Sequence, residues 1–155
     1  MIFRLFVALI FMTLTACNER PREVGNESSG HELTGTWKLL TGTTISNGDT
    51  TITDYTTDRS FIKIINNTHF AFLNHDLNKG SDSLAVYGSG GGTYELDGEQ
   101  YVEHLEYCTD RAWEGHDFKF TVSINNDTLV QSGVEIVESE GINRENIEKY
   151  IRLKN

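Results

Sequence analysis

Residues 117–135 read DFKFTVSINNDTLVQSGVE. Apolar and polar side chains alternate from Phe118 to Ile124, and a second alternating run begins after the cluster Asn125–Asp127. Alternation with a period of two places successive side chains on opposite faces of a strand. A short Asn/Asp cluster between two such runs is typical of a hairpin turn. The stretch therefore predicts an antiparallel hairpin whose apolar side chains at 118–124 face the interior.

Short alternating segments continue on both sides of this hairpin. From Leu33 onward no helical periodicity of any length is present, and Asn, Asp and Gly clusters separate the segments. We predict eight strands, with the spans Gly35–Ile45, Arg59–Ile65, His69–Asn74, Thr93–Leu96, Gln100–Cys108, Asp117–Ile124, Thr128–Glu135 and Glu148–Leu153. Further turns are expected at Asn66–Asn67 and at Asp97–Gly98, a favoured type I′ dipeptide. Consecutive hairpins predict an all-β fold, an antiparallel up-and-down eight-stranded barrel, with a sandwich as the alternative.

Three segments are expected outside these strands. Ser46–Asp58 is predicted to be a long loop, and Asp76–Gly92 is rich in Gly, Ser and Asp, with Leu84–Tyr87 as a candidate extra strand. Asn143–Ile147 is predicted to form a short helical turn. The glycine run 88–92 lacks the lysine and following helix of a phosphate-binding loop. We expect it to bulge the strand that enters at Thr93 or to form a lip at the barrel mouth.

The first 32 residues have a different composition. Residues 1–16 contain one Arg, no acidic residue and an apolar run from Leu5 to Met12, the layout of a secretory signal. That run is shorter than the roughly 30 Å of membrane hydrocarbon requires. Leu14–Cys17 (LTAC) resembles the bacterial lipobox, which implies cleavage before Cys17 and lipidation of its thiol.

Residues 17–32 are polar and hold the only proline, so they are predicted to be a flexible tether to a barrel over 33–155. Asn18 after the lipidated cysteine is compatible with sorting to the outer membrane. The expected location is therefore the cell envelope, lipid-anchored, with the periplasmic or surface face left open. The alternatives are an ordinary cleaved signal and an anchor that is retained.

Composition excludes one class of partner. The 155 residues hold 23 acidic and 13 basic side chains, a formal net charge of −10. Nucleic acid binding depends on a basic footprint, so no nucleic acid partner is expected. Of the two cysteines, Cys17 is assigned to lipid, which leaves Cys108 as the single thiol and permits no intrachain disulfide.

Gly35-Thr36-Trp37 opens the first predicted strand and Arg152 lies in the last. This pair resembles the calycin pattern of lipocalins and fatty-acid-binding proteins. The resemblance implies that Trp37 closes one end of the barrel and that the Arg152 guanidinium packs across its ring, donating to nearby carbonyls.

A wider similarity covers nearly the whole domain. It is carried by the segments 35–40 (GTWKLL), 63–72 (KIINNTHFAF), 90–94 (GGGTY), 101–107 (YVEHLEY) and 148–152 (EKYIR). These segments resemble a family of small bacterial lipocalin-like lipoproteins that are common in Bacteroidetes. Two features depart from the family: Tyr150 stands where its members often carry Trp, and 138–146 resembles an insertion. The resemblance implies a fold and a location, and it implies no ligand or activity.

The strand Gln100–Cys108 is the most informative for a site. If regular, it sends Tyr101, Glu103, Leu105 and Tyr107 to one face and Val102, His104, Glu106 and Cys108 to the other. Either register places a glutamate inside, and a buried carboxylate requires a cationic or hydrogen-bonding partner or a wet cavity. The candidate ligand-binding residues are His69, Tyr94, Tyr101, Glu103, His104, Glu106 and Tyr107. The alternative is that one glutamate lies at a solvated rim while the tyrosines fill the barrel.

Metal and nucleophilic chemistry find little support in the spacing. His69, His75, His104 and His116 lie on different segments without the spacing of a metal motif. His104 and Cys108, four residues apart on a strand, are separated by roughly 13 Å. We therefore expect no metal, no cofactor and no catalytic set, and Cys108 is interpreted as a half-buried structural thiol.

Three functions remain as hypotheses. The first is an envelope lipoprotein whose barrel binds a small hydrophobic or amphiphilic molecule. The second is a structural or interaction module with a filled barrel that displays loops such as Ser46–Asp58. The third is a barrel enzyme using Glu103 or Glu106 with His104 or His69 as acid and base.

Overall fold

The computed structural model describes residues 32–83 and 85–154. The predicted signal, Cys17 and all but the last residue of the predicted tether lie outside the described residues. Within the described part the strands are β1 (Gly35–Ser46), β2 (Asp49–Asp54), β3 (Arg59–Ile65), β4 (His69–Asp76), β5 (Tyr87–Asp97), β6 (Gln100–Cys108), β7 (His116–Asn125), β8 (Thr128–Val137) and β9 (Ile142–Arg152). Two 3-10 helices, η1 (Arg111–Trp113) and η2 (Glu138–Glu140), lie between strands. No helix among these residues is long and apolar enough to cross a membrane.

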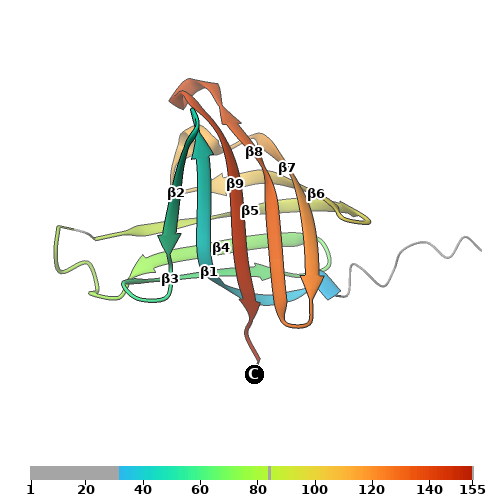
Figure 1. Cartoon of the computed structure of the whole chain (residues 1–155), viewed down its shortest axis with the longest axis horizontal. Helices are drawn as coiled ribbons and strands as arrows, with labels where there is room; N and C mark the ends of the chain where they lie inside the picture. The colour runs from blue at the N-terminus through green and yellow to red at the C-terminus, as the bar shows by residue number, and fades with distance from the viewer. Residues whose placement is uncertain (1–31, 84, 155) are drawn as a thin grey trace, which may run out of the picture.

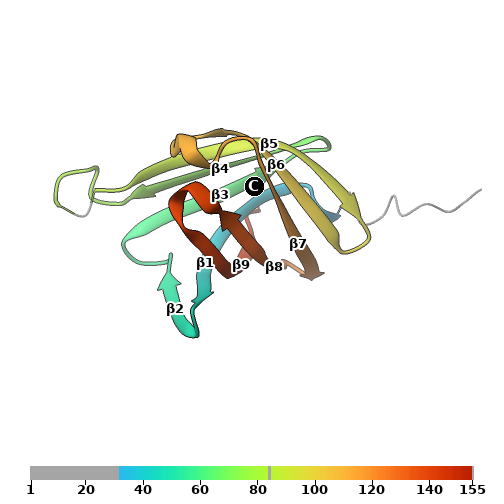
Figure 2. The same ribbon diagram turned by 90° about the horizontal axis from the view of Figure 1, so that it is seen from above.

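The strands form a closed barrel. Each strand from β3 to β9 pairs antiparallel with the next, β1 pairs with β3, and β9 pairs back with β1. Eight strands therefore complete the circle, which confirms the predicted up-and-down barrel and excludes the sandwich. In Figure 1 β3, β4 and β5 cross β1, β8 and β9 at a steep angle, and Figure 2 shows the same strands from above.

β2 was not predicted, and the interpretation of Ser46–Asp58 as a loop is wrong. Asn47 and Gly48 both have positive φ, 52° and 88°, as a type I′ turn requires. The turn returns the chain antiparallel to β1, pairing Ser46 with Asp49 through Thr41 with Asp54. β3 pairs with the other half of the same edge, Gly35–Lys38. The sheet therefore forks along β1, and β2 is a branch beside the barrel mouth.

Other predicted boundaries also change. The predicted helical turn at Asn143–Ile147 is wrong, because these residues belong to β9, which pairs with β8 from Ile142 onward. The extra strand at 84–87 does not form as predicted: residues 85 and 86 lie in a loop, and Tyr87 begins β5. In the β5–β6 hairpin Asp97 pairs with Gln100 and the positive φ, 61°, falls on Gly98. Glycine at the first loop position is typical of a type II′ turn rather than the predicted I′.

A bulge lies beside the glycine run, but its extra residue is on β6 and not on the glycine-bearing strand as expected. Gly91 pairs with Tyr107 and Gly92 with Leu105, so Glu106 is the extra residue on β6. A Cβ atom at Gly92 would lie 1.9 Å from the His104 carbonyl oxygen, which is why this close approach requires glycine. The bulge breaks the regular alternation assumed for β6. Tyr107 consequently points outward and Cys108 inward, the reverse of the predicted assignment.

Trp37 and Arg152 close one end of the barrel as expected. Trp37 is fully buried and its Nε1 donates to the Leu33 carbonyl at 2.9 Å. The Arg152 guanidinium lies 4.0 Å from the ring centroid and donates to the carbonyls of Thr34, at 2.7 Å, and Glu32. These contacts combine a cation–π interaction with charge-assisted hydrogen bonds.

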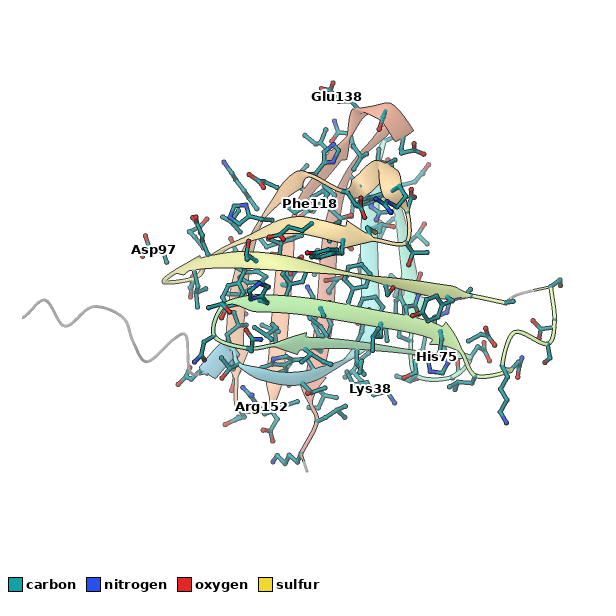
Figure 3. The ribbon with its side chains drawn as sticks, turned by 180° about the vertical axis from the view of Figure 1, so that it is seen from behind. Lys38, His75, Asp97, Phe118, Glu138 and Arg152 are labelled. Atoms are coloured by element: carbon teal, nitrogen blue, oxygen red, sulfur yellow. The ribbon has the colours of Figure 1, made fainter. Side chains whose placement is uncertain are left out.

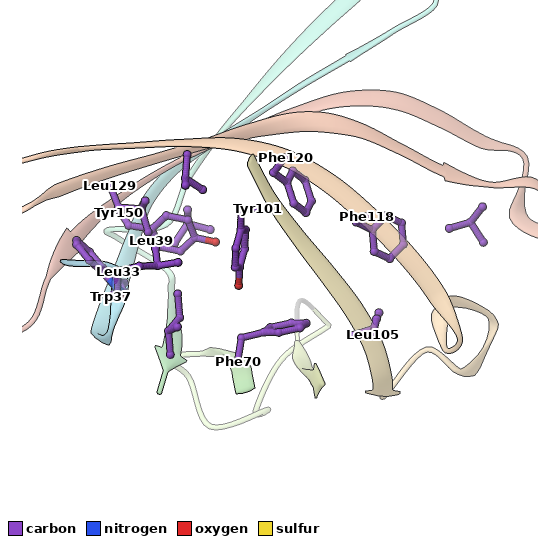
Figure 4. Close-up of a cluster of buried hydrophobic side chains, with 13 residues drawn as sticks. Leu33, Trp37, Leu39, Phe70, Tyr101, Leu105, Phe118, Phe120, Leu129 and Tyr150 are labelled. Carbon is purple, nitrogen blue, oxygen red and sulfur yellow. The ribbon is translucent and has the colours of Figure 1, made fainter. Parts of the chain in front are cut away.

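The two ends of the barrel differ in how they are filled. We call the end formed by the turns 66–68, 98–99 and 126–127 the closed end. The opposite end, with the loop residues 47–48, 55–58, 77–83, 85–86, 109–115 and 138–141, is the open end. Figure 3 places Arg152 and Glu138 at these opposite ends. The fully buried side chains of Leu33, Trp37, Leu39, Leu129 and Tyr150 gather near the closed end, whereas Leu105 and Phe118 lie away from them (Figure 4).

Candidate ligand-binding cavity

A cavity of about 500 Å³ occupies the barrel interior above this packed layer. It opens at one end, and Asp110 and Trp113 of the 109–115 loop segment line it. Its apolar lining includes Tyr55, Phe61, Phe72, Leu105, Trp113, Phe118 and Phe120. Its polar lining includes Lys63, Glu103, Gln131, Glu135, Arg144, Asn146 and Glu148. A cavity of this size and mixed character is typical of small-molecule sites.

A buried ion pair forms the floor of the cavity. Lys63 of β3 and Glu103 of β6 are 3% and 7% exposed, and Nζ lies 2.6 Å from Oε1. The same Nζ donates to Gln131 Oε1 of β8 at 3.0 Å. A glutamate inside the barrel was expected to have a cationic partner, a hydrogen-bonding partner or a wet cavity, and the structure shows the first of these. The charges are compensated before any ligand enters.

A second ion pair lies nearer the open end, between β8 and β9. Arg144 Nε donates to Glu135 Oε2 at 2.7 Å, and Asn146 Nδ2 donates to Glu135 Oε1 at 2.9 Å. The Arg144 guanidinium lies 5.4 Å from the Trp113 ring centroid. Burial raises the pKa of Glu135, while the charge of Arg144 opposes the rise. Arg144 is thus held by a carboxylate and an aromatic ring.

Glu148 is the third inward carboxylate of the cavity and differs from the other two. Its Oε2 accepts a hydrogen bond from the Tyr150 hydroxyl at 2.6 Å. It forms no ion pair with any Lys or Arg in the part of the chain that the structure describes. Its charge acts on its neighbours: after burial, Glu148 is the largest cause of the raised pKa of Tyr55 and of Tyr150.

Aromatic side chains form much of the cavity wall. Phe61 stacks on Phe72 at 5.6 Å between centroids, and Tyr55 meets the edge of Phe61 at 5.8 Å. Tyr55 reaches the cavity because Gly42 leaves room for its ring: a Cβ atom at Gly42 would lie 3.2 Å from it. On the other side Trp113 packs on Phe118 at 5.5 Å. The rings therefore offer flat apolar surface within the same cavity as the carboxylates, with Tyr55 beside the strand pair Gly42–Glu148.

Three of the predicted site residues lie inside the barrel or at its closed end. Glu103 lines the cavity, as described above. Tyr101 is fully buried below the cavity, and its hydroxyl has no hydrogen-bond partner among the residues that the structure describes. Burial, followed by the charge of Glu103, raises the pKa of Tyr101 far above its ordinary value. Tyr94 packs on Tyr101 at 5.3 Å and donates to the Asn66 carbonyl at 2.8 Å. The two tyrosines fill the closed end rather than line the cavity.

The other four predicted residues lie on the outer surface, a correction to the sequence prediction. His69 contacts the Thr68 hydroxyl, His104 contacts Asp117 at 2.7 Å, Glu106 accepts from the Thr93 hydroxyl at 3.0 Å, and Tyr107 is 68% exposed. For β6 the cause is the register, which sends odd-numbered residues inward as far as Leu105, and then the bulge at Glu106. The proposed acid–base pair of Glu103 and His104 is split between the two faces of the barrel wall.

Among the cavity residues absent from the sequence prediction are five polar ones: Gln131, Glu135, Arg144, Asn146 and Glu148. All lie on β8 and β9, at alternate positions that face inward. The signal that could have found them is the polar alternation 144, 146, 148 on β9, but outward Ile147 and Ile151 give that strand the opposite polarity. Because apolar residues are ordinarily assigned to the interior, the pattern favours the wrong face.

Cys108 lines the cavity near the open end and is the free thiol of the described residues. Burial raises its pKa, which lowers its reactivity as a thiolate. Among the described residues no three His, Cys, Asp or Glu side chains are grouped as a metal site would require.

No protein-family model matches the chain, and no curated protein is significantly similar to it in sequence. The class of the protein therefore follows from its architecture. It is a closed antiparallel eight-stranded barrel with a lipocalin-like fold.

Proposed function

We propose that the protein binds a small amphiphilic molecule within its barrel. The observation that carries the proposal is the cavity of about 500 Å³ at the open end, lined by both aromatic side chains and hydrogen-bonded polar groups. An amphiphile satisfies both surfaces at once, because burial of its apolar body is favourable and its polar group replaces water at Glu148 or Asn146.

The cavity favours this function over the two alternatives. An interaction module was expected to have a filled barrel, and here only the closed end is filled. An acid–base enzyme within the barrel needs Glu and His side chains that both face the cavity, whereas Glu103 faces inward alone and Glu106, His69 and His104 lie on the outer surface. Ligand binding is therefore the function that the open cavity supports best.

The proposed setting is the bacterial envelope, with the barrel held by lipid on Cys17. Support comes from the signal-like N-terminus and the LTAC sequence. Metabolic labelling with a radioactive fatty acid tests this location. Label is expected in the full chain and is expected to be lost in Cys17→Ser, with Cys108→Ser as the matched control that keeps it. Label that persists in Cys17→Ser contradicts the anchor.

Native mass spectrometry of the protein purified from its own host tests the binding function. The expected result is a mass excess over the lipidated chain that disappears on denaturation. A second measurement localises the ligand: removal of the ligand is expected to accelerate alkylation of Cys108, read at the peptide level, because Cys108 lines the cavity. A chain that carries no retained molecule, and whose Cys108 reacts at the same rate before and after denaturing extraction and refolding, contradicts the proposal.

A further inference from the structure

The charges inside the cavity do not balance. Lys63 is paired with Glu103, and Arg144 is paired with Glu135. Glu148 remains, and it accepts a hydrogen bond from the neutral hydroxyl of Tyr150. The inward residues of the cavity thus carry two cations against three carboxylates, before the rim residue Asp110 adds a further negative charge.

An anionic ligand and a cationic ligand would face different energetic costs at these groups. An anion that seeks Lys63 or Arg144 must compete with a carboxylate already at 2.6 or 2.7 Å, and separation of a buried ion pair is costly. A cation that approaches Glu148 separates no ion pair. It adds a charge partner to a half-buried carboxylate whose hydrogen bond from Tyr150 can remain.

The aromatic rings beside Glu148 favour the same sign of charge, and one of them, Tyr55, already has the Arg59 guanidinium 5.5 Å from its ring centroid. Tyr55 lies over Gly42, which pairs with Glu148 across β1 and β9. Phe61 contacts both Tyr55, at 5.8 Å, and Tyr150, at 6.4 Å. The faces of aromatic rings attract cations through their quadrupole, whereas they offer an anion no such attraction. Carboxylate and rings therefore lie on one side of the cavity.

We propose that the ligand is an organic cation, a protonated amine or quaternary ammonium attached to an apolar or aromatic body, with its nitrogen at Glu148. The inference rests on the proposed function, because it names the chemical class that the same cavity takes. The apolar body packs on the rings of Tyr55, Phe61 and Phe72. The nitrogen supplies the positively charged partner that Glu148 lacks.

Isothermal titration calorimetry of the full chain with three probes of one shape tests the inference. Tryptamine is the cation, tryptophol the neutral analogue and indole-3-propionate the anion. The expected order of affinity is tryptamine, tryptophol, indole-3-propionate, with at least about a tenfold difference between the first and the second, the effect of one charge-assisted hydrogen bond.

The variant Glu148→Gln keeps the acceptor for Tyr150 and removes the charge. It is expected to reduce tryptamine affinity by about tenfold or more and to leave tryptophol affinity nearly unchanged. Glu145→Gln removes the same charge from the exposed face of β9 and is the matched control, expected to bind tryptamine as the native chain does.

The two proposals fail in different ways. If tryptophol or indole-3-propionate binds at least as tightly as tryptamine, or if Glu148→Gln binds tryptamine with native affinity, the cavity binds ligands and the cation inference is wrong. If none of the three probes binds at millimolar concentration, the proposal that the cavity binds small aromatic amphiphiles fails, and the inference fails with it. A melting curve confirms that Glu148→Gln is folded, so that lost binding reports the charge.

Discussion

The two tryptophans of the chain lie at opposite ends of the barrel and have opposite surroundings. Trp37 is fully buried at the closed end, with its Nε1 bonded to the Leu33 carbonyl and the Arg152 guanidinium over its ring. Trp113 is half-buried at the open end, in η1, beneath the Arg144 guanidinium and along the cavity. Both rings meet an arginine, yet one is part of a packed core and the other lines open space.

The difference separates the residues that hold the barrel together from those that line the cavity and, under the proposed function, select the ligand. At the closed end polar groups are bonded to the backbone and apolar side chains fill the volume. At the open end polar groups are hydrogen-bonded to one another around a cavity. Because fewer atoms pack against them, packing there contributes less to the stability of the fold. Stability is therefore expected to depend chiefly on the closed end, and binding on the open end.

Replacement of each tryptophan measures this division. Trp37→Ala is expected to lower the free energy of unfolding by about 3–5 kcal/mol, the usual cost of deleting a fully buried aromatic ring. Trp113→Ala, half-exposed, is expected to cost about 1–2 kcal/mol, in line with an average substitution. Urea denaturation followed by circular dichroism gives both values. Equal losses at the two ends would show that the division of roles is wrong.

The Lys63–Glu103 pair lies at the boundary between the two ends. Lys63→Met leaves Glu103 buried without its cation, and such a loss typically costs about 3–5 kcal/mol. The double variant Lys63→Met/Glu103→Leu removes both charges and is expected to recover most of this loss. Equilibrium unfolding of the single and double variants tests both values. A double variant as unstable as the single one would indicate that the fit of the side chains, rather than charge compensation, determines the stability of this layer.

Tyr101 offers a small gain in stability at the closed end. Its buried hydroxyl has no hydrogen-bond partner, and an unsatisfied buried polar group costs about 1–3 kcal/mol. Tyr101→Phe keeps the ring contact with Tyr94 and removes the hydroxyl, so the free energy of unfolding is expected to rise by about 1 kcal/mol. Thermal denaturation beside Tyr94→Phe, whose hydroxyl does have a partner, provides the comparison. A decrease in stability for Tyr101→Phe would contradict the prediction.

The smallest expected effect lies outside the barrel, at His104. The hydrogen bond to Asp117 is the largest cause that raises the pKa of His104 above its ordinary value of 6.5. A raised pKa in the folded state contributes stability that is fully present below the unfolded value and is lost as pH rises through the folded value. This exposed pair is expected to contribute about 0.2–1 kcal/mol. Unfolding measured at pH 6 and pH 8.5 should show a decline with pH in the native chain that is smaller in His104→Gln.

Much of the fold was predictable because its strands obey simple alternation. Phe118, Phe120 and Val122 are buried as predicted, and the positions of Trp37 and Arg152 anticipated the cation–π contact at the closed end. The cavity was less predictable, because its polar residues on β8 and β9 face inward where alternation assigns apolar ones. The Asn47–Gly48 dipeptide is a turn signal from which β2 could have been predicted. The Thr-rich residues on either side of it lack a clear alternation of apolar and polar side chains, so the strand was not recognised.

The alternation of apolar and polar residues could not predict the bulge at Glu106, because the bulge depends on how closely β5 approaches β6 at Gly92. One register shift decided which of Tyr107 and Cys108 faces inward. Of the seven predicted site residues, Glu103 alone lines the cavity. The energetic cost of a buried charge predicted that Glu103 needs a partner or water, but the structure was needed to identify Lys63 as that partner.

The most direct test uses the two indole N–H groups as reporters of the two ends. Two-dimensional ¹H–¹⁵N spectra of the ¹⁵N-labelled protein, recorded during titration with unlabelled tryptamine, resolve Trp37 and Trp113 separately. The expected result is a saturable shift of the Trp113 resonance, with the Trp37 resonance unmoved beneath Arg152. Shifts of equal size at both indoles, or none at either at saturating probe, would contradict a binding cavity confined to the open end.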